Sequence, residues 1–295
     1  MKQHLAQAVI IRRSILEDVF RDFNHSSRIW LRRILEPLVW TSANRFAQMA
    51  AQFDEMVAST CFQYAICQLL GSFVSEIDLY GLEHVPREGP LLVISNHPGT
   101  YDSLAIAASM PRDDLNIIAM GYSLLRRLPS ASRHLIFVEP QAHMNLSVVR
   151  STIRHLRSGG SVLIFPRGRV EPDPAVLPGA LESMQAWSPS LELFLREVPQ
   201  TKALVTIVSG VLSPIFLRNP LTRFWRGLHD PQAIAEVTQI AVQMLFRKWG
   251  RVKPRISFNI PRTLDDLYQE GGSLHQSIVN EARDLLVDHL PMSGQ

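Results

Sequence analysis

A histidine and a carboxylate stand close together in the segment NHPGTYD, which contains His97 and Asp102. The segment follows the apolar run LLVIS at 91–95, and open α/β sheets place their sites at the carboxyl ends of strands. Pro98 and Gly99 predict a turn, and we expect a helix to begin near Asp102. The carboxylate can then fold back on the imidazole and make it a base for a hydroxyl. Alone, the seven residues fit equally well a helix-capping aspartate beside an ordinary loop histidine.

Two arginines follow a second apolar run in the segment SVLIFPRGRVEPD, at residues 161–173. Gly168 lets the backbone approach a ligand closely. Arg167 and Arg169 carry guanidinium forks, which bind phosphate well. A solvated turn with two surface arginines explains this segment more simply when it is taken by itself.

Two stretches mix aromatic side chains with arginines. The first is RIWLRRILEPLVW at 28–40, in which Pro37 is expected to end or kink a helix, and the second is SPIFLRNPLTRFWRGLH at 213–229. Aromatic and cationic side chains together suit the interface of an anionic bilayer. Core packing with solvated arginines explains either stretch alone, but the presence of both favours contact with a membrane surface.

The sequence lacks the motifs of several other kinds of site. It has no HExxH and no paired CxxC, so no metal site is expected. Cys61 and Cys67 are expected to face different sides of a helix, which argues against a disulfide. The glycine pairs lack a nucleotide-binding pattern, so no bound cofactor is expected, and Ser209 is not in a nucleophile elbow.

Strands that alternate with helices must position these residues from about residue 76 onward. Apolar runs of strand length occur at 91–95, 115–120, 134–139, 161–165, 203–208 and 255–260. Helical patterns fit 145–157, 232–249 and 273–289. We therefore predict an α/β fold, a mostly parallel sheet flanked by helices. A proline-rich loop is expected at 171–180.

Composition and the N-terminal pattern complete the expected organisation. The chain has 295 residues, 46% hydrophobic and 19% charged, which describes a folded globular protein. A net charge of +3 is too small to indicate nucleic acid as a partner. Residues 1–75 read as helical, and we expect them to form a membrane-docking extension before an α/β domain at 76–295. No secretory signal and no run of ~18 apolar residues is visible, so we expect an intracellular protein that lies on a membrane.

Taken together and in order, these segments resemble the glycerolipid acyltransferases, the superfamily of glycerol-3-phosphate and lysophosphatidic acid acyltransferases. The lead-in YGLEHVPREGPLLVISNH is similar to the family's approach to its active site, and His97 and Asp102 match its His–four residues–Asp signature. FPRGRVEP stands where the family has Phe-Pro-Glu-Gly and a basic residue, and HLIFVEP and ALVTIVSG fall where its second and fourth blocks would be. The resemblance covers roughly residues 76–215.

This resemblance implies acyl transfer without a covalent intermediate. His97 would deprotonate the acceptor hydroxyl, Asp102 would orient His97, and the hydroxyl would attack an acyl thioester supplied by acyl-CoA or acyl carrier protein. Backbone N–H groups near the Phe-Pro-x-Gly turn or a helix N-terminus could hold the oxyanion. The residues expected to bind substrate are Asn96, Arg167, Gly168, Arg169 and Glu171.

Three departures from the family pattern concern the blocks associated with the acceptor and its phosphate. They are Arg167 in place of the glutamate, Glu139 with Pro140 in place of an arginine, and Thr206 in place of a proline. Arg169 keeps one phosphate contact, and Glu171 could replace the lost carboxylate from a shifted position. The acceptor can therefore differ from glycerol 3-phosphate or lysophosphatidic acid, whereas the base and its orienting residue are intact.

The sequence thus predicts a peripheral (monotopic) O-acyltransferase of phospholipid biosynthesis on the cytoplasmic side of a membrane. Its expected partners are the membrane surface, an acyl donor and a glycerolipid or lysophospholipid acceptor. One alternative, motivated by the altered FPRG block, is a non-catalytic protein of the same fold that binds lipid or acyl chains. Another is an acyl-thioester hydrolase, in which water takes the place of the lipid hydroxyl.

Overall fold

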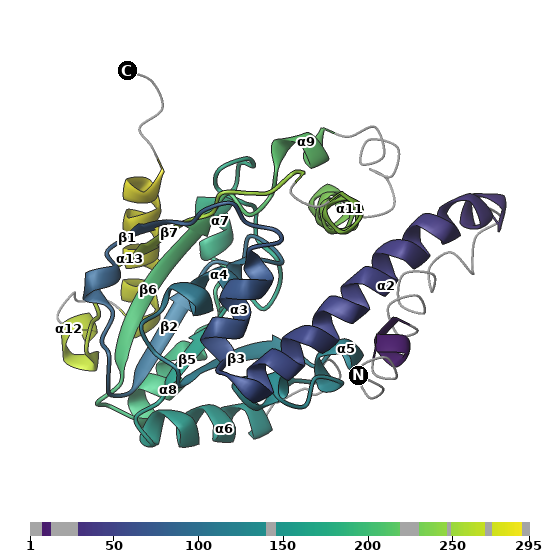
Figure 1. The fold of residues 1–295 in the computed structure, drawn as a ribbon. Coiled ribbons are helices and arrows are strands. Elements are labelled where there is room, and N and C mark those ends of the chain that lie inside the picture. The colour runs from purple at the N-terminus through teal and green to yellow at the C-terminus, as the bar shows by residue number, and fades with distance from the viewer. Residues whose placement is uncertain are drawn as a thin grey trace.

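A single seven-stranded sheet with the order β1-β7-β6-β2-β5-β3-β4 forms the centre of the protein (Figure 1). The computed structural model describes residues 8–12, 29–139, 146–218, 230–246, 249–268 and 273–290, with only the backbone described for 29–39. The strands are β1 (Asp78–Tyr80), β2 (Leu91–Ser95), β3 (Leu115–Met120), β4 (Leu135–Val138), β5 (Ser161–Ile164), β6 (Lys202–Ser209) and β7 (Arg255–Phe258). Neighbouring strands pair in parallel except β6 and β7. The predicted fold class, a mostly parallel sheet flanked by helices, is confirmed.

The six predicted strands correspond to β2 through β7. All five residues of β2 are buried, as expected for a central parallel strand covered on both faces. The sequence does not predict β1, because Asp78–Tyr80 is too short to show a periodic pattern. Pairing with β7 holds this short strand in the sheet.

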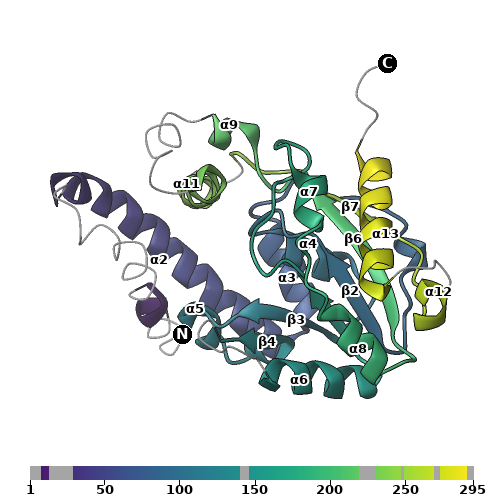
Figure 2. The same ribbon diagram turned by 180° about the vertical axis from the view of Figure 1, so that it is seen from behind.

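Helices cover both faces of the sheet (Figures 1 and 2). The main ones are α2 (Ile29–Ser59), α3 (Phe62–Leu70), α4 (Asp102–Ser109), α6 (Leu146–Arg157), α8 (Leu191–Glu197), α11 (Pro231–Leu245) and α13 (Leu274–His289). Short helices are η2 (Leu82–His84), α5 (Ser123–Arg126), η3 (Ala131–His134), α7 (Ala180–Met184), α9 (Pro214–Leu217) and α12 (Leu264–Tyr268). The predicted helices correspond to α6, α11 and α13, although α11 ends at Leu245, before the predicted end.

Alternating side chains of β2 divide the core between the two faces. Leu91 and Val93 belong to the cluster that includes residues of α2, α3 and α4. Leu92 and Ile94 belong to the cluster that includes residues of α6, α7, α8 and α13. This division follows from the two-residue period of a strand.

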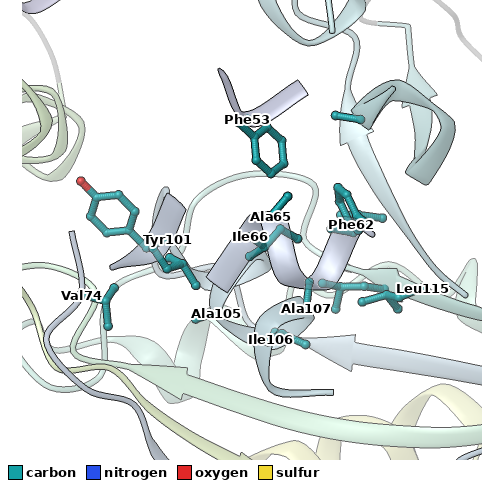
Figure 3. Packing of buried hydrophobic residues seen from close by; sticks show 14 of the residues in the cluster. Phe53, Phe62, Ala65, Ile66, Val74, Tyr101, Ala105, Ile106, Ala107 and Leu115 are labelled. Carbon is teal, nitrogen blue, oxygen red and sulfur yellow. The ribbon is translucent and has the colours of Figure 1, made fainter. Parts of the chain in front are cut away.

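Close packing of α3 on α4 fixes the helix that carries Asp102 (Figure 3). Ala65 and Ile66 of α3 are buried with Ala105 of α4, and Phe53 of α2 belongs to the same cluster. The small alanine side chains let the two helices approach closely. Because α4 begins at Asp102, this packing sets the position of that carboxylate relative to the sheet.

The long helix α2 is anchored at its C-terminal half. Asp54 Oδ1 accepts hydrogen bonds from the N–H groups of Ser130 and Ala131, both at 2.9 Å. The N-terminal part of α2 extends away from the sheet (Figure 1). Of the two alternatives predicted for Pro37, that it ends the helix or kinks it, the first is wrong, since α2 continues through residue 37. A proline removes one helical hydrogen bond, and the remaining turns on both sides keep the helix continuous.

The two basic and aromatic stretches have different environments where they are described. Trp40 is 46% exposed, and the guanidinium carbon of Arg12 lies 5.0 Å from its ring centroid. In the second stretch, Phe216 is buried and meets Trp249 edge-on, with 5.8 Å between centroids. Phe216 therefore packs in the interior, and residues 219–229 lie outside the described residues. None of the helices described is both long enough and apolar enough to span a bilayer.

Candidate functional site

His97 and Asp102 form a hydrogen-bonded pair just beyond the carboxyl end of β2. His97 Nδ1 lies 2.7 Å from Asp102 Oδ2. The Asp102 side chain is fully buried, whereas the His97 side chain is 27% exposed. The other ring nitrogen, Nε2, makes no hydrogen bond with the residues described. The aspartate thus occupies one side of the imidazole and leaves the other side for a ligand.

The turn between the two residues is closed by the same carboxylate. The N–H of Gly99 donates to Asp102 Oδ2 at 3.0 Å, and the N–H of Ser103 donates to Oδ1. Gly99 has a φ of +155°, which side-chain-bearing residues rarely adopt. Asp102 therefore both orients the histidine ring and holds the loop that carries it.

The second predicted segment lies beside the histidine because β5 is the neighbour of β2 in the sheet. Phe165 follows β5, and its ring stacks on His97 with 4.4 Å between the centroids. Arg167 is half-buried, and Gly168 and Arg169 are exposed in the turn that follows. Neither guanidinium forms an ion pair within the described part of the chain. Two arginines therefore lie in the turn that follows Phe165, and the charge of Arg167 also favours ionised Glu171.

Glu171 holds the backbone of His97 from inside the protein. Its Oε2 accepts the N–H of His97 at 2.9 Å, and its own N–H donates to the His97 carbonyl at 2.7 Å. Its Oε1 accepts from Ser183 Oγ at 2.8 Å and from Trp187 Nε1 at 3.0 Å. Burial raises the pKa of Glu171, although these hydrogen bonds and Arg167 favour the ionised form. Glu171 is 1% exposed, so the carboxylate faces the histidine backbone rather than an open surface.

Asn96 also points inward, toward β6. Its Nδ2 donates to the carbonyl of Val208, and the N–H of Val208 donates to its Oδ1, both at 2.8 Å. The residue is 1% exposed. Of the five residues expected to bind substrate, Asn96 and Glu171 thus position the histidine loop, while Arg167, Gly168 and Arg169 remain accessible.

The residues that depart from the family pattern are spread around the sheet. Thr206 is fully buried on β6 opposite Ser95 of β2, and its hydroxyl has no partner in the described structure. Glu139 forms an ion pair with Arg126 of α5. Pro140 lies outside the described residues.

A third carboxylate beside the pair is not predicted from the sequence. Glu236 of α11 accepts a hydrogen bond from Thr100 Oγ1 at 2.9 Å. Burial raises the pKa of Glu236 to about 7; the Thr100 hydrogen bond and the His97 charge oppose that rise, and Asp102 adds to it. The negative charge near the imidazole is therefore shared among Asp102, Glu171 and Glu236.

Polar side chains along one face of α11 bind the loops of the site. Gln232 Nε2 donates to the carbonyls of Pro98 and Glu171, at 2.7 and 2.9 Å. Gln239 bonds the loop after β6 through the carbonyl of Val211, and Gln243 bonds the hydroxyl of Tyr101. These glutamines and Glu236 recur at helical spacing, which is the only sequence signal that could have indicated their role.

The surrounding charges favour the protonated form of His97. Burial alone would lower its pKa, but the charge and hydrogen bond of Asp102 outweigh burial, with smaller contributions from Glu236 and Glu171. The pKa of His97 is therefore raised above its usual value. A histidine in this environment is a stronger base than a free imidazole, and its imidazolium form is stabilised.

Other features of the described residues lie apart from this pair. A cavity of about 490 Å³ between α6 and the β3–β4 edge is lined by residues that include Asn116, Phe137, Ser151 and Arg154. No group of three His, Cys, Asp or Glu in the described chain has the arrangement of a metal site. Cys61 and Cys67 are free and exposed.

Comparisons with known proteins give one family match and a similar solved structure. A family model described as Acyltransferase matches residues 76–189, which include His97, Asp102 and the arginine turn. A search of curated proteins gives no match. Among solved structures, the 1-acyl-sn-glycerophosphate (LPA) acyltransferase PlsC from Thermotoga maritima is similar, with 15% sequence identity and a TM-score of 0.44. That match covers 97% of this chain and 95% of the other.

Proposed function

We propose that this chain, whose residues 76–189 match a family model described as Acyltransferase, transfers a fatty acyl group from an acyl thioester to a hydroxyl of a glycerolipid or lysophospholipid-type acceptor. One observation carries the mechanism. The Nδ1 atom of His97 is bound to buried Asp102 at 2.7 Å, while the imidazole remains partly exposed. This is the arrangement that a general base for a hydroxyl requires.

In the proposed step, His97 Nε2 takes the proton from the acceptor hydroxyl as its oxygen attacks the thioester carbonyl. The new C–O bond forms, the tetrahedral intermediate collapses, and the C–S bond breaks. The departing thiolate receives the proton from the imidazolium. Asp102 keeps Nδ1 protonated and stabilises the imidazolium, and no residue of the chain forms a covalent bond with the acyl group.

The arginine turn is the proposed site for an anionic group of a substrate. Arg169 is exposed and Arg167 is half-buried, and neither forms an ion pair among the described residues, although the charge of Arg167 favours ionised Glu171. Guanidinium groups bind phosphate oxygens through paired hydrogen bonds. The stacking of Phe165 on His97 brings this turn next to the base. A phosphate on the acceptor or on the donor could bind here, and a panel of acceptors distinguishes the two.

We further propose that the protein acts at a membrane surface as a peripheral enzyme on the cytoplasmic side. The helix α2 extends away from the sheet (Figure 1). Trp40, which belongs to this helix, is exposed. An exposed tryptophan with an adjacent arginine suits the boundary between headgroups and acyl chains. The donor in this proposal is acyl-CoA or acyl carrier protein, and the reaction needs no further cofactor.

The decisive experiment measures ester formation by purified protein with vesicles. Acyl-CoA or acyl carrier protein is supplied with glycerol 3-phosphate, a lysophosphatidic acid or a lysophospholipid without a terminal phosphate, and both free thiol and ester product are quantified. His97→Ala and Asp102→Asn should each lower turnover by about 100-fold or more, because general-base catalysis commonly contributes that much. The exposed His84 gives a matched control, and His84→Ala should keep wild-type turnover.

The same assay separates the alternatives. Free fatty acid as the main product in the presence of lipid acceptors would identify a thioester hydrolase. Thiol release no higher than that of His97→Ala, across all acceptors, would identify a non-catalytic binding protein. Wild-type turnover by correctly folded His97→Ala would contradict the role of the histidine.

A further inference from the structure

Glu236 is packed against the loop that joins His97 to Asp102, although it comes from α11. Its Oε2 accepts the hydroxyl proton of Thr100 at 2.9 Å. Its Oε1 lies only 3.0 Å from the position that a Cβ atom on Gly99 would take. A side chain at residue 99 would require the Glu236 carboxylate to shift, so the glycine permits this close approach.

The second oxygen of Glu236 has no hydrogen-bond partner in the described part of the molecule. Oε1 is nonetheless buried from solvent. A buried carboxylate oxygen without a donor is unfavourable by itself. It gains favourable interaction when a positive charge forms nearby, and His97 is the neighbouring group that becomes positive.

We propose that Glu236 is a positioning residue that sets the proton affinity of His97 and so determines the pH range in which the base works. This proposal rests on the proposed function, because Glu236 would control the base that the proposed reaction uses. The ionised carboxylate stabilises the imidazolium that forms when the acceptor hydroxyl loses its proton. Thr100 holds the carboxylate in place over the loop.

The groups that face Glu236 determine the direction of this effect. His97 is the group that gains positive charge, Asp102 is a fixed negative charge, and Tyr101 remains a neutral phenol because burial raises its pKa. The amide of Gln232 on the same helix favours the ionised form. Because the pKa of Glu236 is raised to about 7, the carboxylate and the imidazole titrate in the same pH range and their protonation is coupled.

The test compares two substitutions that separate charge from shape. Glu236→Gln keeps the size and a hydrogen-bond acceptor for Thr100 but removes the charge. Glu236→Asp keeps the charge but shortens the side chain. The pKa of His97 is measured by NMR titration of its imidazole in the full-length protein. We expect Glu236→Gln to lower that pKa by about half a unit to one unit, and Glu236→Asp to retain most of the wild-type value.

Kinetics give the same comparison through the reaction. The acid limb of the pH profile of kcat/KM should move to lower pH in Glu236→Gln by the same amount as the NMR pKa. Asp284→Asn removes an exposed charge on α13 and should leave both quantities unchanged. An unchanged pKa in Glu236→Gln, or an equal decrease in Glu236→Asp, would overturn the proposal.

A second variant keeps the test informative if Glu236→Gln does not fold. Thr100→Val removes the hydrogen bond that favours ionised Glu236, so the pKa of His97 should fall in the same direction by a smaller amount. No decrease in this variant would count against the proposal. The NMR measurement does not depend on turnover. Failure to find any acyl transfer would therefore refute the proposed function while the NMR result still decides the role of Glu236.

Discussion

Asn96 offers the sharpest test of how the histidine loop is held, because it was expected to bind substrate and instead points into the sheet. Asn96→Ala removes two hydrogen bonds of 2.8 Å to the backbone of Val208 on β6. Asn96 is 1% exposed, so water cannot easily reach the N–H and carbonyl of Val208 to replace the lost amide. The substitution leaves one N–H and one carbonyl of a central strand without partners.

The size of the effect follows from these two groups. A buried donor or acceptor left unsatisfied costs about 1–3 kcal/mol, so two of them should lower the free energy of unfolding by about 3 kcal/mol. That is a large part of the roughly 5–15 kcal/mol by which folded proteins are stable. The loss of the side-chain volume adds a smaller decrease in the same direction.

Urea denaturation followed by circular dichroism measures this effect. Asn116→Ala is the matched control, because Asn116 is half-buried on β3 and its side chain makes no hydrogen bond among the described residues. We expect the control to change stability by about 0.5 kcal/mol or less. The wild type and both variants should be compared under conditions where refolding is complete.

Kinetics distinguish a loop anchor from a substrate contact. If Asn96 anchors the loop, Asn96→Ala should lower kcat through misplacement of His97 and change the acceptor KM little. A variant within about 1 kcal/mol of wild-type stability that raises the acceptor KM would refute the reasoning and support direct contact with substrate.

Two further predictions concern His289 and Arg169. His289 is buried between the hydroxyls of Ser209 and Ser257, and burial lowers its pKa to about 4, with Arg255 acting in the same direction. Below about pH 6.5 the imidazole of His289 takes up a proton in the unfolded chain before it does so in the folded protein, so the free energy of unfolding decreases as the pH is lowered. In urea titrations, His289→Gln should make the decrease between pH 7.5 and pH 5 smaller by about 2 kcal/mol. Arg169→Gln should raise the KM for a phosphate-bearing substrate about tenfold with kcat little changed, and an equal effect on all substrates would contradict phosphate binding.

The strands could be predicted from simple periodicity. The proximity of the NHPGTYD and FPRGRVEP segments could be predicted because each one follows a strand of a parallel sheet. Each central strand is an apolar run of strand length, and buried parallel strands show that pattern. The carboxyl ends of β2 and β5 lie at the same edge of the sheet, so His97 and the arginine turn are brought together. The prediction of the pair itself depended on the spacing between His97 and Asp102.

The directions of loop side chains could not be predicted in the same way. Asn96 and Glu171 lie next to motif residues, which suggested contact with substrate, yet both turn toward the backbone of the protein. A loop has no period that assigns its side chains to a face, unlike a helix or a strand. Glu236 is also 136 positions from its partner Thr100, so their contact depends on how α11 crosses the site.

The position of the base therefore depends on contacts made from three segments of the chain, two of them distant in sequence. Asp102 binds the His97 ring, Glu171 binds the His97 backbone, and Gln232 binds the carbonyls of both Pro98 and Glu171. Each of these contacts acts on the same short loop, so a loss at any one of them moves the imidazole without removing it. Such changes should appear mainly in kcat, because a small displacement of a base weakens the transition state more than it weakens substrate binding. The fold thus determines the rate of the proposed reaction through residues that need not touch the substrate.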